Sequence, residues 1–96
     1  MPEQTFVNRS AFERALLGFI NGPLLERHGD AHVRVSERTP LFTEGVIDSL
    51  GILDLLVFIE QATGRPIPLR RVDMRYFASV RAISESFWNE EERAAP

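Results

Sequence analysis

The chain contains no cysteine, so its own residues cannot form a disulfide, a thiolate metal site or a thiol nucleophile. It also contains no lysine: its 11 basic residues are all arginine, and 14 acidic residues outnumber them, which gives a formal net charge of −3. A protein that binds the phosphate backbone of nucleic acids needs clustered positive charge. The composition therefore argues against nucleic acid as a partner.

Long apolar runs are absent too. No stretch of the sequence approaches the roughly 20 apolar residues of a membrane-spanning helix. The first residues lack the basic and apolar regions of a signal peptide. We therefore expect a cytoplasmic protein that makes no contact with a membrane.

Internal repeats, low-complexity tracts and linkers are also missing, and 96 residues are enough for a single domain. We expect one domain over residues 1–96, with a core over about residues 8–88 and frayed ends. A domain of this size buries about 60–65% of its unfolded surface, which supports one small core but seldom a deep enzyme pocket. The length therefore disfavours an enzyme.

Helical periodicity is present from the start of this core. Between Asn8 and Ile20, apolar residues such as Phe12 and Leu16 recur at intervals of three and four, and Asn8 or Ser10 can act as N-cap. This pattern predicts an amphipathic first helix.

The first helix is expected to be interrupted at Asn21-Gly22-Pro23 and to resume as a kinked turn to about His28. A long connection should follow over residues 29–47. Connections of more than about 12–15 residues are usually functional or held down by their own side chains. The apolar side chains expected to hold this one are Val33, Val35, Leu41, Phe42 and Val46 or Ile47.

A second strong helix is predicted from Ser49 to about Thr63, with Asp48 as its N-cap and Gly64 as its left-handed stop. Its apolar side chains surround most of the circumference instead of forming one stripe. We expect one face to be buried. The remaining apolar side chains indicate either an exposed docking surface or a helix at the centre of a bundle.

Two further elements complete the predicted fold. Asp73 can cap a single turn over Met74–Phe77, and Ser79 can cap a last helix whose aromatic residues at its end, Phe87 and Trp88, are expected in the core. The sequence therefore predicts an all-α fold: a small four-helix bundle with a long loop between helices 1 and 2 and a very short helix 3.

Chemistry and structure coincide at Ser49. At the first position of a helix, unsatisfied backbone N–H groups and the positive end of the helix dipole favour an anion. Gly45 allows the preceding loop to turn tightly, and Val46 or Ile47 can then enter the core. We therefore expect the Ser49 hydroxyl at the surface, where a phosphate ester would be well placed.

The stretch from Leu41 to Ile83 resembles the acyl carrier proteins of fatty-acid, polyketide and nonribosomal-peptide biosynthesis. It covers nearly half of the chain. The shared pattern is Leu41, Gly45-x-Ile47-Asp48-Ser49-Leu50, Leu53, Leu55, Ile59-Glu60, Gly64 and Phe77-x-Ser79-x-x-x-Ile83.

The resemblance implies a non-enzymatic carrier in which Ser49 bears 4′-phosphopantetheine. A phosphopantetheinyl transferase would move this group from coenzyme A onto Ser49, and its thiol would hold an acyl or aminoacyl cargo as a thioester. In the family, the residue that matches Asp48 also assists the transferase and its magnesium. A flexible arm raises the effective concentration of the cargo at partner active sites.

The resemblance also implies that the second helix is the main recognition element for partner enzymes. Its apolar members would provide contact area, and its carboxylates would steer toward basic surfaces. The residues expected to face partners are Leu50, Leu53, Asp54, Val57 and Glu60.

This helix contains few acidic residues, and Gly51 stands where many fatty-acid carriers have one. We therefore expect a free-standing, monomeric carrier of a specialised pathway, loaded by an acyl or aminoacyl ligase and used by downstream biosynthetic enzymes.

Other readings of these residues are weaker. A serine-hydrolase elbow requires Gly-x-Ser-x-Gly, but Ile47 occupies the first glycine position. His28, Asp30 and His32 alternate near a glycine, which is more typical of a polar loop than of a metal site, so no metal is expected.

The main alternative is a non-catalytic helical module that binds proteins or DNA. It would use the five arginines between residues 65 and 81, namely Arg65, Arg70, Arg71, Arg75 and Arg81. The negative net charge speaks against DNA. Uptake of a phosphopantetheine group by the carrier, but not by such a module, would separate the two functions.

Overall fold

The computed structural model describes residues 8–30, 32–68, 70 and 72–88. Over these residues the chain is 59% helical and contains no strand, in keeping with the expected all-α class. The expected count of four helices is not confirmed, because the described residues hold three helical rods and one 3-10 turn.

The first rod is continuous and contains α1 (Arg9–Phe19), the π-helical turn η1 (Ile20–Leu24) and α2 (Leu25–His28). The side chain of Asn8 caps it by accepting a hydrogen bond of 2.8 Å from the Ala11 amide. The interruption expected at residues 21–23 takes the form of a π-helical turn and not of a break, and the α-helix resumes to His28, as predicted. Proline has no N–H to donate and crowds the carbonyl one turn back, and the wider π turn around Pro23 accommodates both effects.

The long connection after α2 is fastened to this rod by Asn21. The Asn21 side chain donates to the Val35 carbonyl at 2.9 Å and accepts from the Val35 amide at 2.7 Å. Val35, Leu41 and Ile47 are buried, as predicted. The other expected anchors are partly buried against the core, namely Val33, Phe42 and Val46.

Helix α3 (Gly51–Thr63) begins two residues later than predicted and ends at Gly64, as expected. Gly64 has a φ of 73°, the left-handed conformation that glycine adopts without strain. The late start follows from the first turn, where amides bond to carbonyls three residues back: Gly51 to Asp48 at 3.0 Å and Ile52 to Ser49 at 3.3 Å. Tight turns of this kind are common at helix ends.

The last two elements are the 3-10 turn η3 (Met74–Phe77) and helix α4 (Val80–Phe87). Asp73 Oδ1 accepts from the Arg75 amide at 2.9 Å, and Ser79 Oγ accepts from the Ala82 amide at 3.1 Å. Both predicted caps are confirmed. The short third helix is this single 3-10 turn.

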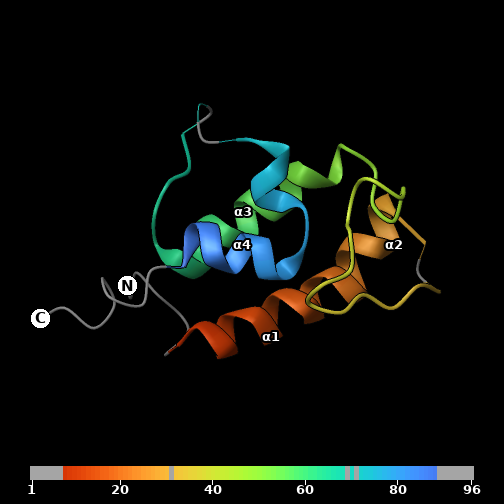
Figure 1. Cartoon of the computed structure of the whole chain (residues 1–96), viewed down its shortest axis with the longest axis horizontal. Helices are drawn as coiled ribbons and strands as arrows, with labels where there is room; N and C mark the ends of the chain where they lie inside the picture. The colour runs from red at the N-terminus through yellow and green to blue at the C-terminus, as the bar shows by residue number, and fades with distance from the viewer. Residues whose placement is uncertain (1–7, 31, 69, 71, 89–96) are drawn as a thin grey trace, which may run out of the picture.

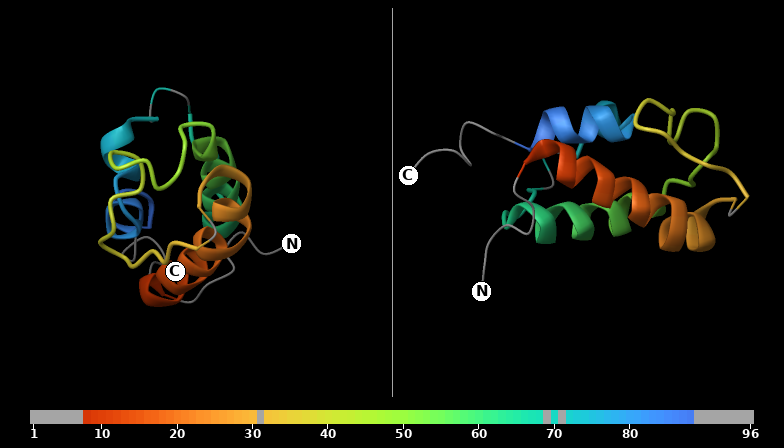
Figure 2. Two further views of the ribbon diagram at one scale, coloured as in Figure 1. Left: turned by 90° about the vertical axis from the view of Figure 1, so that its right-hand side faces the viewer. Right: turned by 90° about the horizontal axis from the view of Figure 1, so that it is seen from below.

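Helices α3 and α4 both run back along the first rod, in the direction opposite to α1 (Figures 1 and 2). Trp88 is buried as expected and stacks on Phe12 with ring centroids 5.3 Å apart. The start of α1 and the end of α4 lie at one end of the molecule, and the start of α3 lies at the other. The core residues are Phe12, Leu16, Ile20, Leu24, Leu25, Val35, Leu41, Ile47, Leu55, Ile59, Ala62, Phe77, Val80, Ile83 and Trp88.

Candidate functional site

Ser49 lies in the turn that leads into α3, and it is exposed to solvent. It was expected at the first position of the α-helix, but the α-helical spacing begins at Gly51. Among the residues that the structure describes, none forms a hydrogen bond with the Ser49 hydroxyl. The oxygen is therefore available for chemistry at the surface.

The backbone before Ser49 is fixed by pairing with the end of α2 and by a hydrogen bond to Leu41. The Asp48 amide donates to the His28 carbonyl at 2.8 Å, and Gly29 and Ile47 form an isolated antiparallel bridge. The Ile47 amide donates to the Leu41 carbonyl at 2.9 Å. The buried side chain of Ile47 adds an apolar anchor. An exposed serine is thus presented on a turn attached to the end of α2.

Gly45 makes the approach to this turn possible. Its φ of 74° is in the left-handed region, and its amide donates to the Phe42 carbonyl at 3.1 Å. The chain then turns so that Ile47, rather than Val46, becomes fully buried. The tight turn predicted at Gly45 is confirmed.

Asp48 caps the turn that leads into α3, whereas it was predicted as the N-cap of the helix itself, a position that Leu50 holds. Its Oδ1 atom accepts hydrogen bonds from the Leu50 amide at 3.0 Å and the Gly51 amide at 3.2 Å. These are donors that were expected to be free for a phosphate at Ser49. That expectation needs correction, because the Asp48 carboxylate already satisfies them.

An exposed apolar stripe begins directly after Ser49. Leu50, Leu53 and Val57 are 64%, 60% and 52% exposed, whereas Leu55 and Ile59 on the other side of α3 are buried. We call Leu50, Leu53 and Val57 the apolar stripe. The circumference of this helix therefore has one buried face and one exposed apolar face.

The two carboxylates of α3 contact groups of the chain itself. Asp54 Oδ2 lies 3.3 Å from Arg27 Nη2, and Glu60 Oε2 accepts a hydrogen bond of 2.8 Å from the Ile67 amide. Both were expected to face partners. In the structure, Asp54 lies against α2 and Glu60 holds the segment after α3, while both side chains keep some exposure to solvent.

An apolar pocket of about 380 Å³ lies between the loop after Leu41 and the η3 turn, a site that the sequence analysis missed. Its lining includes the partly buried ring of Phe42 and the exposed side chain of Met74. The two segments lie some thirty residues apart, so no local pattern could reveal the pocket. The lining residues are Phe42, Thr43, Met74, Arg75 and Ala78.

Arg75, at the edge of this pocket, pairs with the cap of η3. Its Nη2 atom lies 2.8 Å from Asp73 Oδ2. The hydrogen bonds from the Arg75 side chain and amide lower the pKa of Asp73 to about 2, and the Asp73 carboxylate raises the pKa of Arg75. This pair therefore carries opposite charges at neutral pH.

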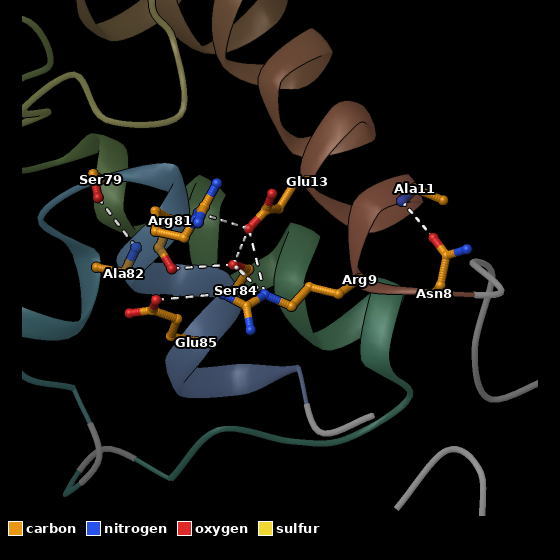
Figure 3. A network of polar contacts seen from close by, with 9 residues as sticks. All are labelled: Asn8, Arg9, Ala11, Glu13, Ser79, Arg81, Ala82, Ser84 and Glu85. Atoms are coloured by element: carbon orange, nitrogen blue, oxygen red, sulfur yellow. Dashed lines mark hydrogen bonds and ion pairs between the residues drawn. The ribbon is translucent and has the colours of Figure 1, made fainter. Parts of the chain in front are cut away.

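A second polar cluster, also missed from the sequence, joins α1 to α4 (Figure 3). Ser84 is fully buried, and its hydroxyl donates to Glu13 Oε2 and accepts from Arg9 Nε at 3.1 Å. Arg81 Nε lies 3.4 Å from the same Glu13 oxygen. We call Arg9, Glu13, Arg81 and Ser84 the α1–α4 brace. It fastens the two helices together.

The arginines that the alternative binding module would use are partly engaged within the chain. Arg75 pairs with Asp73, and Arg81 pairs with Glu13. Arg71 lies outside the described residues. In the part of the chain that the structure describes, no three His, Asp or Glu side chains are placed to hold a metal ion. No helix there is long and apolar enough to cross a bilayer.

No protein-family model matches the chain, and searches of curated proteins and of solved structures return no match.

Proposed function

We propose that this protein is an acyl or aminoacyl carrier protein in which Ser49 Oγ bears 4′-phosphopantetheine. The observation that carries this proposal is an exposed serine hydroxyl at the head of α3, in the sequence Gly45-Val46-Ile47-Asp48-Ser49-Leu50, on a turn fixed to the end of α2. The helical architecture, with a 3-10 turn between α3 and α4, supports the same reading.

The residues around Ser49 fit such a group. Its hydroxyl is exposed, so an enzyme can reach it, and Asp48 caps the turn on which it stands. During modification the Ser49 oxygen would attack the phosphorus next to pantetheine in coenzyme A. A P–O bond to Ser49 would form as a P–O bond of the pyrophosphate breaks, 3′,5′-adenosine diphosphate would leave, and the hydroxyl proton would pass to a base of the transferase or to solvent. The group would then supply a thiol, which this chain otherwise lacks, to hold cargo as a thioester.

The surface beside Ser49 supports recognition by partner enzymes. The apolar stripe continues from the modified residue along α3 and offers contact area without an unpaired charge of its own. The partners on this proposal are a phosphopantetheinyl transferase, an acyl or aminoacyl ligase and downstream biosynthetic enzymes. The apolar pocket at Phe42 and Met74 is a suitable surface for an apolar cargo on the arm.

The proposal is tested by incubating the protein with coenzyme A, magnesium and a promiscuous phosphopantetheinyl transferase, and then measuring its intact mass. We expect a gain of one phosphopantetheine group, which Ser49→Ala abolishes. Ser10→Ala is the matched control, because Ser10 is also exposed and lies in the first turn of a helix. It should be modified like the wild type.

An unchanged mass in the wild type with several competent transferases would contradict the carrier function. That result would favour the alternative, a helical module for binding proteins or DNA. Modification that persists in Ser49→Ala would show that the wrong serine was chosen.

A further inference from the structure

His28, the last residue of α2, lies between the carboxylate of Asp48, in the turn before α3, and that of Asp54, in the first turn of α3. Its Nδ1 atom is 3.2 Å from Asp48 Oδ1, and its Nε2 atom is 3.5 Å from Asp54 Oδ2. The imidazole is mostly buried, with 21% of the side chain exposed. This mostly buried ring therefore contacts the residue that directly precedes Ser49.

The shorter of these two contacts reaches the cap of α3. Asp48 Oδ1 already accepts from the amides of Leu50 and Gly51, so the imidazole approaches the same oxygen that organises the turn. The backbone of His28 acts at the same residue, because its carbonyl accepts from the Asp48 amide. One residue of α2 therefore holds both the main chain and the side chain of the residue next to Ser49.

Gly51 provides the space for this arrangement. A Cβ atom at that position would lie 2.5 Å from Ile47 Cγ2 and 3.3 Å from His28 Cβ. The first contact is too short for a real Cβ atom and the second is tighter than most, so a larger residue would force Ile47 to shift and would crowd the His28 side chain. The glycine gives the first turn of α3 close access to the His28 side chain.

We propose that His28 is a positioning residue for the reaction at Ser49: by holding the Asp48 carboxylate, it fixes the turn that presents the Ser49 hydroxyl, and Gly51 gives it the room to do so. The inference rests on the proposed carrier function. The contact of His28 with Asp54 is longer and is shared with Arg27, so it has the lesser part in this role.

The test separates the two ring nitrogens of His28. Asparagine places an amide nitrogen near the position of Nδ1, whereas glutamine places one near the position of Nε2. His28→Asn therefore keeps a donor toward Asp48, and His28→Gln keeps one only toward Asp54. The measurement is kcat/KM for transfer of phosphopantetheine from coenzyme A by the promiscuous transferase, at a temperature at which circular dichroism shows each variant folded.

We expect His28→Gln and His28→Ala to lower kcat/KM about tenfold. A loss of this size results if the turn that presents Ser49 correctly is populated about one tenth of the time. His28→Asn should retain most of the wild-type value. A residue that only stabilised the fold would change the unfolding midpoint without this difference between asparagine and glutamine. His32→Ala and Arg27→Gln are controls that should be modified like the wild type.

Equal kcat/KM for all three His28 variants, whether at the wild-type value or reduced alike, would overturn the inference. So would a higher value for glutamine than for asparagine. If His28→Ala does not fold, the comparison of asparagine with glutamine decides the question. Failure of the carrier function is a separate result, because the wild type would then gain no phosphopantetheine at all.

Discussion

Asp48 has a structural role and a proposed chemical role that one pair of substitutions can separate. As a cap, it needs only an oxygen that accepts from the Leu50 and Gly51 amides. Asparagine retains such an oxygen and loses the charge, whereas alanine loses both. The cap is therefore preserved in Asp48→Asn and removed in Asp48→Ala.

We predict that Asp48→Ala lowers the free energy of unfolding by about 1 kcal/mol, the usual effect of losing an N-cap, and that Asp48→Asn changes it by a few tenths at most. Urea unfolding measures both values. If the carboxylate also assists the transferase and its magnesium, both variants should accept phosphopantetheine more slowly than the wild type. If the stable Asp48→Asn protein accepts phosphopantetheine at the wild-type rate, Asp48 acts only as a cap.

At the scale of elements, α3 separates its two faces sharply. The apolar stripe is exposed, and the opposite face is packed in the core, where Leu55 and Ile59 have no exposed surface. A charge on the first face costs little stability, whereas a charge on the second is buried without a partner. The helix thus supplies its own control positions for a test of docking.

We predict that Leu53→Asp and Val57→Asp weaken transfer of cargo or phosphopantetheine by raising KM about tenfold. The free energy of unfolding of both variants should stay within about 0.5 kcal/mol of the wild-type value. Leu55→Asp should instead unfold the domain. Steady-state transfer kinetics and thermal unfolding make the comparison. If the apolar stripe has no part in docking, both exposed variants will show wild-type kinetics. If Leu53→Asp or Val57→Asp unfolds, the exposed face is misassigned.

The η3 turn offers a prediction on pH. The pKa of Asp73 is about 2 in the folded protein, below its ordinary value of 3.8, because Arg75 donates to it from both side chain and backbone. A lowered pKa stabilises the fold at pH values above about 4, and this contribution disappears as the pH falls toward 2. The pair is exposed, so its effect on overall stability is small.

Carboxyl chemical shifts followed by NMR should give a midpoint near pH 2 for Asp73. In Arg75→Gln the midpoint should rise toward the ordinary value but stop short of it, because the backbone hydrogen bond at residue 75 remains. The same midpoint in both proteins would mean that Arg75 does not cause the shift.

At the scale of the whole molecule, the local features were predictable from sequence. Caps such as Asn8, Asp73 and Ser79 bond to amides two or three residues along the chain, so their signals lie within a few positions. The stop at Gly64 is local in the same way. The exposed Ser49 and the buried face of α3 also follow from short-range pattern.

Features that depend on distant contacts were not predictable. Asn21 bonds to Val35, 14 residues away, and Ser84 bonds to Glu13, 71 residues away. The first contact holds the long connection against the π turn. The sequence predicted an interruption at Pro23, but not that it would be a π turn within a continuous rod. The hydrogen bond that Glu60 accepts from the Ile67 amide also depends on where the chain runs after α3, so the sequence did not indicate it.

The separation between the start of α1 and the start of α3 has a practical consequence (Figure 1). Because the chain has no cysteine, Ser10→Cys would introduce its sole thiol, in an exposed position of α1. A donor dye coupled there before modification, and an acceptor dye coupled afterwards to the pantetheine thiol, would label opposite ends of the domain. On the proposed carrier function, energy transfer between them would then report where the end of the arm lies in the protein alone and in its complex with a partner enzyme.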